Sequence, residues 1–316
     1  MTVAVGNISA LPTSGTPWSK LLSTANGSLG TVALSDQNST TAGKTVAAAL
    51  AYKRLGKAEY KTKVDAVLKS FTTTSLSNAR VLSTGRQLAG FCIAADLVNY
   101  REPAFVSRMA ALRSYNFGGH SRWYEINKTS TDSANNWGGW ALASRTAMSA
   151  YVGDVADLAI CNKTYSGYFD RSAYSGFTRT ADYDPNWSYN PSAFVPINPA
   201  TAGDKAGACV EDVSRSSGTY PSIDDTGKTY SWEFLGGATL TARVLFHNGF
   251  TDAFTRGGNG LLRAGQFLAR KNGWPPMYSV NQYIPWEIEN RYKTNVGNNA
   301  AAGLGRQFGF TDWLTV

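Results

Sequence analysis

The sequence predicts an all-α fold, an (α/α) toroid of antiparallel helix hairpins, and three observations lead to this prediction. Several stretches carry apolar residues at helical spacing. Few stretches alternate apolar and polar residues as a half-buried strand would. The helical stretches follow one another through short breaks, which is typical of helix hairpins. Two-helix units stacked in a ring would close into a toroid.

The first expected helices lie in the first quarter of the chain. Residues 41–55 are rich in alanine, the strongest helix former, and Gly56 stands where such a helix would end. Residues 60–71 place their apolar side chains on one face of a helix.

The next three helices complete the first block. Residues 85–100 repeat the amphipathic pattern, and Pro103 opens 103–115, as is common in a first helical turn. The stretch 136–158 is long and apolar, and Gly153 is the expected end of one helix within it.

A second block comprises 231–247 and 251–271, separated by Asn248 and Gly249. Between the blocks, 164–229 contains five prolines, many Gly and Ser, and interleaved aromatic residues. A loop region this long in a compact domain is typically functional or disordered, and the aromatics favour order. We therefore expect a single domain over 1–316, in which this insertion covers one end of a cleft.

Composition excludes several classes of protein. The chain has 316 residues, of which 43% are hydrophobic and 12% aromatic, enough for a large core, so a disordered or fibrous chain is excluded. No run reaches the ~18 apolar residues of a transmembrane helix, so no membrane partner is expected. The absence of metal-binding motifs, with only two histidines, predicts neither a metal site nor a cofactor.

The charge balance favours an anionic partner. Lys and Arg outnumber Asp and Glu by 30 to 22. A basic protein favours a polyanion, which can be nucleic acid, anionic lipid or an acidic polysaccharide. The basic residues are scattered rather than gathered in a stripe, which argues against nucleic acid. The first residues do not form a secretory signal. Only 16% of the residues are charged, and a polar but weakly charged surface is common in proteins that act outside cells. We therefore expect such a protein, either secreted by another route or after removal of a signal, or associated with a virion.

Three segments could carry chemistry. The first is 135–140, where Asn135 and Asn136 open an apolar helix and Trp137 follows. Two interpretations stay open: the asparagines cap the helix, or an amide donates to a substrate carboxylate beside the helix N-terminus.

The second segment is 230–234, in which aromatic residues flank Glu233. Glu233 is either a first-turn acid favoured by the helix dipole or a carboxyl whose pKa the rings raise, so that it binds a uronate as the neutral acid. The third is 286–295, where Arg291 and Lys293 flank Tyr292. Neighbouring cations would lower the pKa of the phenol and favour its use as a base, although Tyr292 could equally be a packed aromatic. His120, in a Gly-Gly turn, could reach a cleft.

These segments resemble the alginate-lyase-like polysaccharide lyases, which have α/α-toroid folds. The resemblance rests on short patterns that occur in order along nearly the whole chain. They are 34–39, 51–54, 85–88, 93–97, 135–138, 143–145, 170–177, 196–199, 230–233, 261–264, 292–295 and 310–313.

The resemblance implies β-elimination beside a uronate in glucuronan, alginate or a related exopolysaccharide, as in a phage or bacterial depolymerase. A base removes the C5 proton while other groups neutralise the carboxylate. By position, Tyr292 would be base and acid, Asn136 and Glu233 would neutralise, and Arg291 would bind a uronate carboxylate. The implied substrate-binding residues are Arg86, Asn135, Trp137, His120, Tyr230, Trp232, Trp286 and Lys293.

Two departures and two alternatives accompany the resemblance. Trp137 stands where such lyases often have His, and residues 40–42 lack the expected His and Asp, which leaves the choice of uronate polymer open. A glycoside hydrolase of similar fold could use Asp225 and Glu233 as its two carboxylates. A non-catalytic carbohydrate-binding protein would bind oligouronates without turnover. The pairing of Cys161 with Cys209 also stays open.

Overall fold

The computed structural model describes residues 4–217, 219–221, 230–272, 279–294 and 302–314. In this part of the chain helices are the regular elements, apart from one isolated bridge between Ile197 and Cys209, so the all-α prediction is confirmed. The helices are α1 (Gly15–Asn26), α2 (Thr41–Leu55), α3 (Ala58–Thr73), α4 (Val81–Gly85), α5 (Leu88–Leu97), α6 (Pro103–Leu112), α7 (Ile126–Asp132), α8 (Asn136–Val152), α9 (Val155–Ser166), α10 (Val210–Ser217), α11 (Tyr230–His247), α12 (Arg256–Asn272) and α13 (Tyr283–Tyr292).

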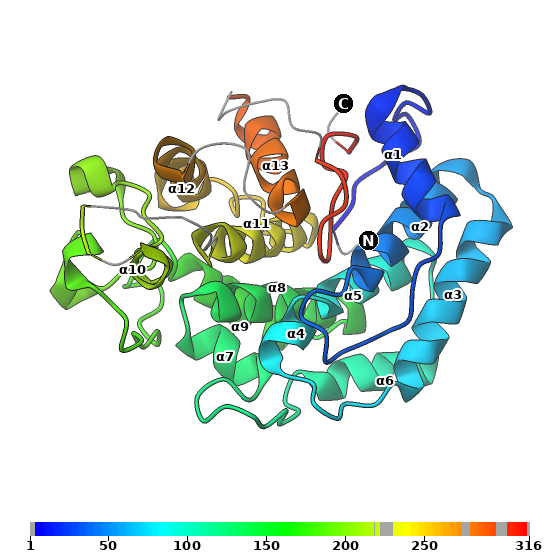
Figure 1. Cartoon of the computed structure of the whole chain (residues 1–316), viewed down its shortest axis with the longest axis horizontal. Helices are drawn as coiled ribbons and strands as arrows, with labels where there is room; N and C mark the ends of the chain where they lie inside the picture. The colour runs from blue at the N-terminus through cyan, green and yellow to red at the C-terminus, as the bar shows by residue number, and fades with distance from the viewer. Residues whose placement is uncertain (1–3, 218, 222–229, 273–278, 295–301, 315–316) are drawn as a thin grey trace.

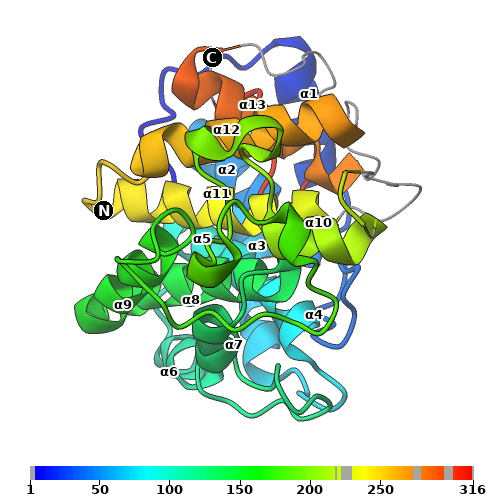
Figure 2. The same cartoon turned by 90° about the vertical axis from the view of Figure 1, so that its left-hand side faces the viewer.

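The helices α8 and α11 form the centre of the molecule. Glycines let their backbones approach closely, since a Cβ on Gly237 would lie 2.3 Å from the carbonyl carbon of Gly139. Both views show α11 between α8 on one side and α12 and α13 on the other (Figures 1 and 2). Figure 1 also shows α1, α2 and α3 gathered at the opposite end of the molecule from α10. The first turns of α8 and α11 thus bring distant parts of the sequence together.

Most of the expected helices are present, with shifted ends. The helix over 41–55 is confirmed, and Gly56 closes it in the left-handed region with φ 69°. The stretch 136–158 divides at Gly153, which has φ 79° and separates α8 from α9. The stretch 85–100 is wrong as a single helix, because the chain turns at Arg86 and Gln87 between α4 and α5.

The insertion expected over 164–229 is ordered in its described part. Within 164–229 the described part holds short 3₁₀ turns, η1 (Pro185–Trp187), η2 (Pro191–Ala193) and η3 (Ala200–Lys205), together with α10. It is therefore ordered and partly helical rather than a plain loop.

Cys92, Cys161 and Cys209 are buried free thiols, so the last two do not form a disulfide.

A segment near the end of the sequence returns into the helices. We call residues 303–310 the C-terminal loop; it closes where the Phe310 amide donates to the Gly303 carbonyl at 2.7 Å. The loop packs against both α2 and α5 at two glycines: a Cβ on Gly43 would lie 2.2 Å from the Gly305 oxygen, and one on Gly90 would lie 2.6 Å from the Gln307 oxygen. This close approach fixes the position of Arg306.

In the described ranges, no helix combines the length and the hydropathy that crossing a membrane requires.

Candidate functional site

A buried cluster of charged side chains surrounds Glu233. Its Oε2 lies 2.9 Å from Arg86 Nη2 and accepts from Trp140 Nε1 at 2.7 Å. Its Oε1 accepts from Asn281 Nδ2 at 3.1 Å and lies 3.5 Å from Arg306 Nε. All five side chains are buried, with Arg86 and Arg306 each 7% exposed. We call these five residues the charged centre.

The setting of Glu233 favours its ionised form. Burial acts to raise its pKa, but the opposing charges of Arg86 and Arg306 and the bonds from Trp140 and Asn281 hold the pKa below its usual value. The expected rise in the pKa of Glu233, on which its role as a neutral acid depended, is therefore wrong. Aromatic neighbours in the sequence predicted the opposite shift, because the arginines that decide it lie far away in the chain.

The two arginines occupy equivalent sequence contexts. Gly-Arg-Gln occurs at 85–87 and again at 305–307. In each case the glutamine anchors the chain: Gln87 Nε2 donates to the Ala33 and Asp36 carbonyls at 3.0 Å, and Gln307 Nε2 donates to the Gly85 carbonyl at 2.7 Å. The repeated tripeptide was a sequence feature that could have indicated Arg306, which the sequence analysis missed.

Next to the charged centre lies a surface that we call the aromatic face, made of His120, Trp123, Trp137, Arg215 and Tyr230. Trp123 stacks on Trp137 with ring centroids 4.6 Å apart, and His120 stacks on Trp123 at 4.5 Å. The Arg215 guanidinium lies 5.0 Å from the Tyr230 ring and 5.6 Å from the Trp123 ring. Tyr230 and Glu233 both lie in the first turn of α11, which joins the aromatic face to the charged centre.

The exposed His120 is fixed as a hydrogen-bond donor toward solvent. Its Nδ1 accepts from the backbone amides of Arg122 at 3.1 Å and Trp123 at 3.2 Å. In the neutral ring the hydrogen is therefore assigned to Nε2. A ligand on the aromatic face would meet a stacked ring and a donor N–H from this residue.

The two asparagines at the start of α8 have different tasks. Asn135 caps the helix, as one of the two open interpretations expected, because its Oδ1 accepts from the amides of Trp137 at 3.0 Å and Gly138 at 3.2 Å. Its Nδ2 donates to Glu211 at 2.8 Å. Asn136 instead accepts from Arg215 Nη1 at 3.0 Å, and its Nδ2 has no partner among the described residues.

Two buried acids of α10 support this corner of the site. Arg215 pairs with Asp212 at 3.0 Å, and burial raises the pKa of both Glu211 and Asp212. Neither acid was among the expected site residues. Arg215 and Trp123 were missed as well, since neither belongs to a recognisable motif and only the fold brings them beside Asn136.

The expected residues of α13 lie elsewhere. Tyr292 is half-buried, and its hydroxyl donates to the Phe254 carbonyl. The Arg291 guanidinium lies over the rings of Phe246 and Phe254, 4.6 Å from each, and donates to Glu287 at 3.1 Å. No described contact joins Tyr292 or Arg291 to the charged centre or the aromatic face.

The expected low pKa of Tyr292 is wrong. Burial raises the pKa of the phenol, and this outweighs the lowering by Arg263 and Arg291. Of the other expected binding residues, Lys293 follows α13 in an exposed left-handed turn, Trp286 is half-buried on α13, and Trp232 is buried at 1% exposure. Asp225 lies outside the described residues.

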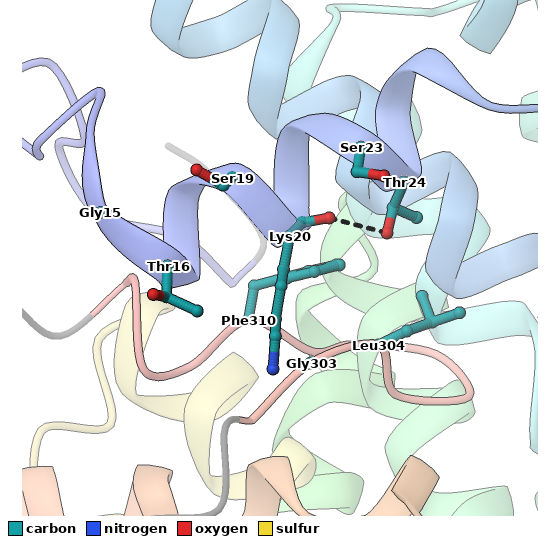
Figure 3. A pocket seen from close by; sticks show the side chains of 9 residues that line it. All are labelled: Gly15, Thr16, Ser19, Lys20, Ser23, Thr24, Gly303, Leu304 and Phe310. Atoms are coloured by element: carbon teal, nitrogen blue, oxygen red, sulfur yellow. Dashed lines mark hydrogen bonds between the residues drawn. The ribbon is translucent and has the colours of Figure 1, made fainter.

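A pocket of about 690 Å³ lies between α1 and the C-terminal loop (Figure 3). Hydroxyls and the amine of Lys20 on α1 line one wall, and Gly303, Leu304 and Phe310 line the other. It contains none of the residues expected from the sequence. In the described residues no group of three or more His, Cys, Asp or Glu side chains is placed to hold a metal ion.

Comparison of the chain with protein-family models, with curated proteins and with solved structures found no match.

Proposed function

We propose that this protein is a polysaccharide lyase that cleaves a uronate-containing polymer, such as glucuronan, alginate or a related exopolysaccharide, by β-elimination. The observation that carries the proposal is the junction of the charged centre with the aromatic face at Tyr230. Closure of the helices into an (α/α) toroid belongs to the same proposal, as does action outside cells by a secreted or virion-associated protein.

The chemistry requires a group that neutralises the uronate carboxylate. In β-elimination a base removes the C5 proton, the electrons of that bond form the C4–C5 double bond, and the 4-O bond breaks. Because the C5 proton is weakly acidic, positive charge and hydrogen-bond donors at the carboxylate must stabilise the intermediate. Arg86 supplies the charge, and the unpartnered Nδ2 of Asn136 supplies a neutral donor.

Tyr230 is the tyrosine best placed to act as base and then as acid to the leaving oxygen. The Arg215 guanidinium lies 5.0 Å from its ring, and Tyr230 stands about one helical turn before Glu233, the partner of Arg86. No described residue hydrogen-bonds to its hydroxyl. Tyr292, which the resemblance implied as the base, instead donates its hydroxyl hydrogen to the Phe254 carbonyl.

The aromatic face fits the sugar rings on either side of the cleaved bond. Trp137 and Trp123 offer stacked planes, and His120 offers an N–H at the edge. A sugar presents apolar C–H groups on its faces and hydroxyls on its rim, which match a ring and a donor in this arrangement.

The test is a turnover assay on a panel of alginate, polymannuronate, polyguluronate, glucuronan, hyaluronan and bacterial exopolysaccharides. Formation of the unsaturated uronate is followed by its ultraviolet absorbance. We expect a rise with at least one polymer, its loss in Tyr230→Phe, and its retention in Tyr292→Phe, the matched control.

Reducing ends are measured in the same samples. New reducing ends without absorbance would replace the lyase by a glycoside hydrolase. That hydrolase would need an acid other than Glu233, whose pKa is lowered by three hydrogen-bond donors and by the second guanidinium, that of Arg306. Saturable binding without either product would leave a carbohydrate-binding protein.

A further inference from the structure

The charged centre contains one more positive charge than negative. Two guanidiniums, Arg86 and Arg306, face the single carboxylate of Glu233. Nearly buried cations without a full counter-charge are costly, and a bound anion would offset that cost. The excess charge is held in place by the protein, because the C-terminal loop is wedged against Gly43 and Gly90.

Arg306 has hydrogen-bonding capacity that the protein does not use. Its Nη1 donates to the Gln37 carbonyl at 3.3 Å and to Asn38 Oδ1 at 3.2 Å. Its Nε lies 3.5 Å from Glu233, and its Nη2 has no partner within the described part of the chain. A guanidinium in this condition retains a free edge for a carboxylate.

The side chain that covers Arg306 is a neutral and exposed one. Asn38 lies in an exposed turn, where its backbone amide donates to Asp36 Oδ1 at 2.8 Å. Its amide oxygen is a weaker partner for a guanidinium than a carboxylate would be. An arriving carboxylate would displace it without disturbing any buried group.

We propose that Arg306 is a specificity-determining residue that binds a carboxylate of the polymer, and that a ligand oxygen takes the place of the Asn38 side-chain oxygen. The inference deepens the proposed function and rests on it, because it concerns the same site. It assigns a role to the C-terminal loop, which delivers the second guanidinium.

The decisive variant is Asn38→Asp, which places a carboxylate where the ligand oxygen would bind. The probes are tetrasaccharides of glucuronate and of mannuronate, measured by calorimetry. We expect Asn38→Asp to bind the better ligand roughly 10-fold or more weakly, the scale of one charge-assisted hydrogen bond. Asn38→Ala should bind as well as wild type or better.

Ser35→Asp is the matched control, since it adds the same charge to an exposed position in the preceding turn, and no described contact joins Ser35 to Arg306. Equal weakening by Ser35→Asp and Asn38→Asp would overturn the proposal, because it would show only a general effect of charge. Failure of both tetrasaccharides to bind the wild type would overturn it as well.

A second measurement uses Arg306→Gln with each tetrasaccharide as free acid and as methyl ester. Wild type should prefer the free acid, and Arg306→Gln should lose most of that preference while still binding the ester. An unchanged preference would overturn the proposal. Absence of unsaturated product from any polymer would refute the lyase and leave this binding test intact, so the two failures are distinguishable.

Discussion

Two regions of the molecule contain the same set of side chains and use them differently. At the start of α11, Tyr230 accompanies Glu233, which lies between Arg86 and Arg306. On α13, Tyr292 accompanies Glu287, which lies 2.5 Å from Arg243 and 3.1 Å from Arg291. Each region therefore has one tyrosine and one carboxylate flanked by two guanidiniums.

The difference lies in how completely the protein satisfies these groups. On α13 the Tyr292 hydroxyl bonds to Phe254, Arg243 donates to the Ala4 carbonyl at 2.6 Å, and Arg291 is covered by two rings. At the start of α11 the Tyr230 hydroxyl and Arg306 Nη2 have no described partner. Composition alone does not identify a site; unused hydrogen-bonding capacity does.

The largest expected effect separates the two tyrosines in turnover. Tyr230→Phe should lower kcat about 10²- to 10⁴-fold, the range of a lost general acid–base group. Tyr292→Phe should leave kcat within a few-fold of wild type and cost about 1 kcal/mol of stability through the lost hydrogen bond to Phe254. Initial rates and urea unfolding measure both, and a reversed order would return the catalytic role to Tyr292.

The next effect concerns the two carboxylates. Glu233→Gln and Glu287→Gln should each lower the free energy of unfolding by about 3–5 kcal/mol, because each leaves buried guanidiniums without their counter-charge. Glu59→Gln, on the exposed side of α3, should be nearly neutral.

A uronate oligosaccharide should then distinguish them. In thermal unfolding it should partly restore Glu233→Gln, because its carboxylate pairs with the unpaired guanidiniums. It should not restore Glu287→Gln, whose arginines are covered by protein. An equal rise in the unfolding temperature of the two variants would contradict the proposed difference between the regions.

A smaller effect, of at most about 3 kcal/mol, is expected from pH in the α13 region. Burial and the charges of Arg243 and Arg291 lower the pKa of His247 from 6.5 to about 4. The folded protein therefore binds fewer protons than the unfolded chain between these values. Above pH 6.5 the titration of His247 does not reduce the free energy of unfolding. As the pH falls from 6.5 toward 4, the unfolded chain binds the proton first, and the free energy of unfolding decreases.

Urea unfolding of wild type and His247→Gln between pH 4 and 7 measures this effect. The variant should show a flatter dependence, whereas parallel curves would contradict the assignment. Binding of an oligouronate at the charged centre should be unaffected by the substitution, since His247 lies at the other end of α11.

The smallest effect concerns the cap of α8. Asn135→Ala should cost about 1 kcal/mol for the lost cap, and somewhat more if the buried Glu211 loses its donor. Asn135→Asp keeps the cap but places a carboxylate beside Glu211, so its loss of stability relative to wild type should be larger at neutral pH than at pH 4. An equal loss relative to wild type at both values would contradict the buried contact.

The sequence predicted what depends on local pattern. The helix over 41–55, the break at Gly153 and the cap at Asn135 follow from propensity and capping, and all three are present. The short helix α10 was missed because its polar sequence lies inside a Pro- and Gly-rich region. The pKa shifts of Glu233 and Tyr292 were predicted with the wrong sign. The pKa of Glu233 is decided by arginines far away in the sequence, and that of Tyr292 by burial, rather than by the neighbouring residues in the chain.

The candidate site shows the same limit. Asn136, Glu233, Arg86, Trp137, His120 and Tyr230 were expected and lie together. Arg306, Arg215 and Trp123 were not expected. The repeated Gly-Arg-Gln tripeptide is the one signal for Arg306, and the packing of the C-terminal loop against α2 and α5 brings this late residue beside Glu233.

The late position of the C-terminal loop in the sequence also determines when the charged centre can be completed during synthesis. Arg86 and Arg306 are separated by 220 positions, so at about 5–20 residues per second a ribosome adds the second arginine roughly 11–44 s after the first. Glu233 and Arg86 can pair during that interval, but Gly43 and Gly90 still lack the backbone that packs on them. A chain interrupted before residue 306 would carry most of the helices and only half of the arginine pair.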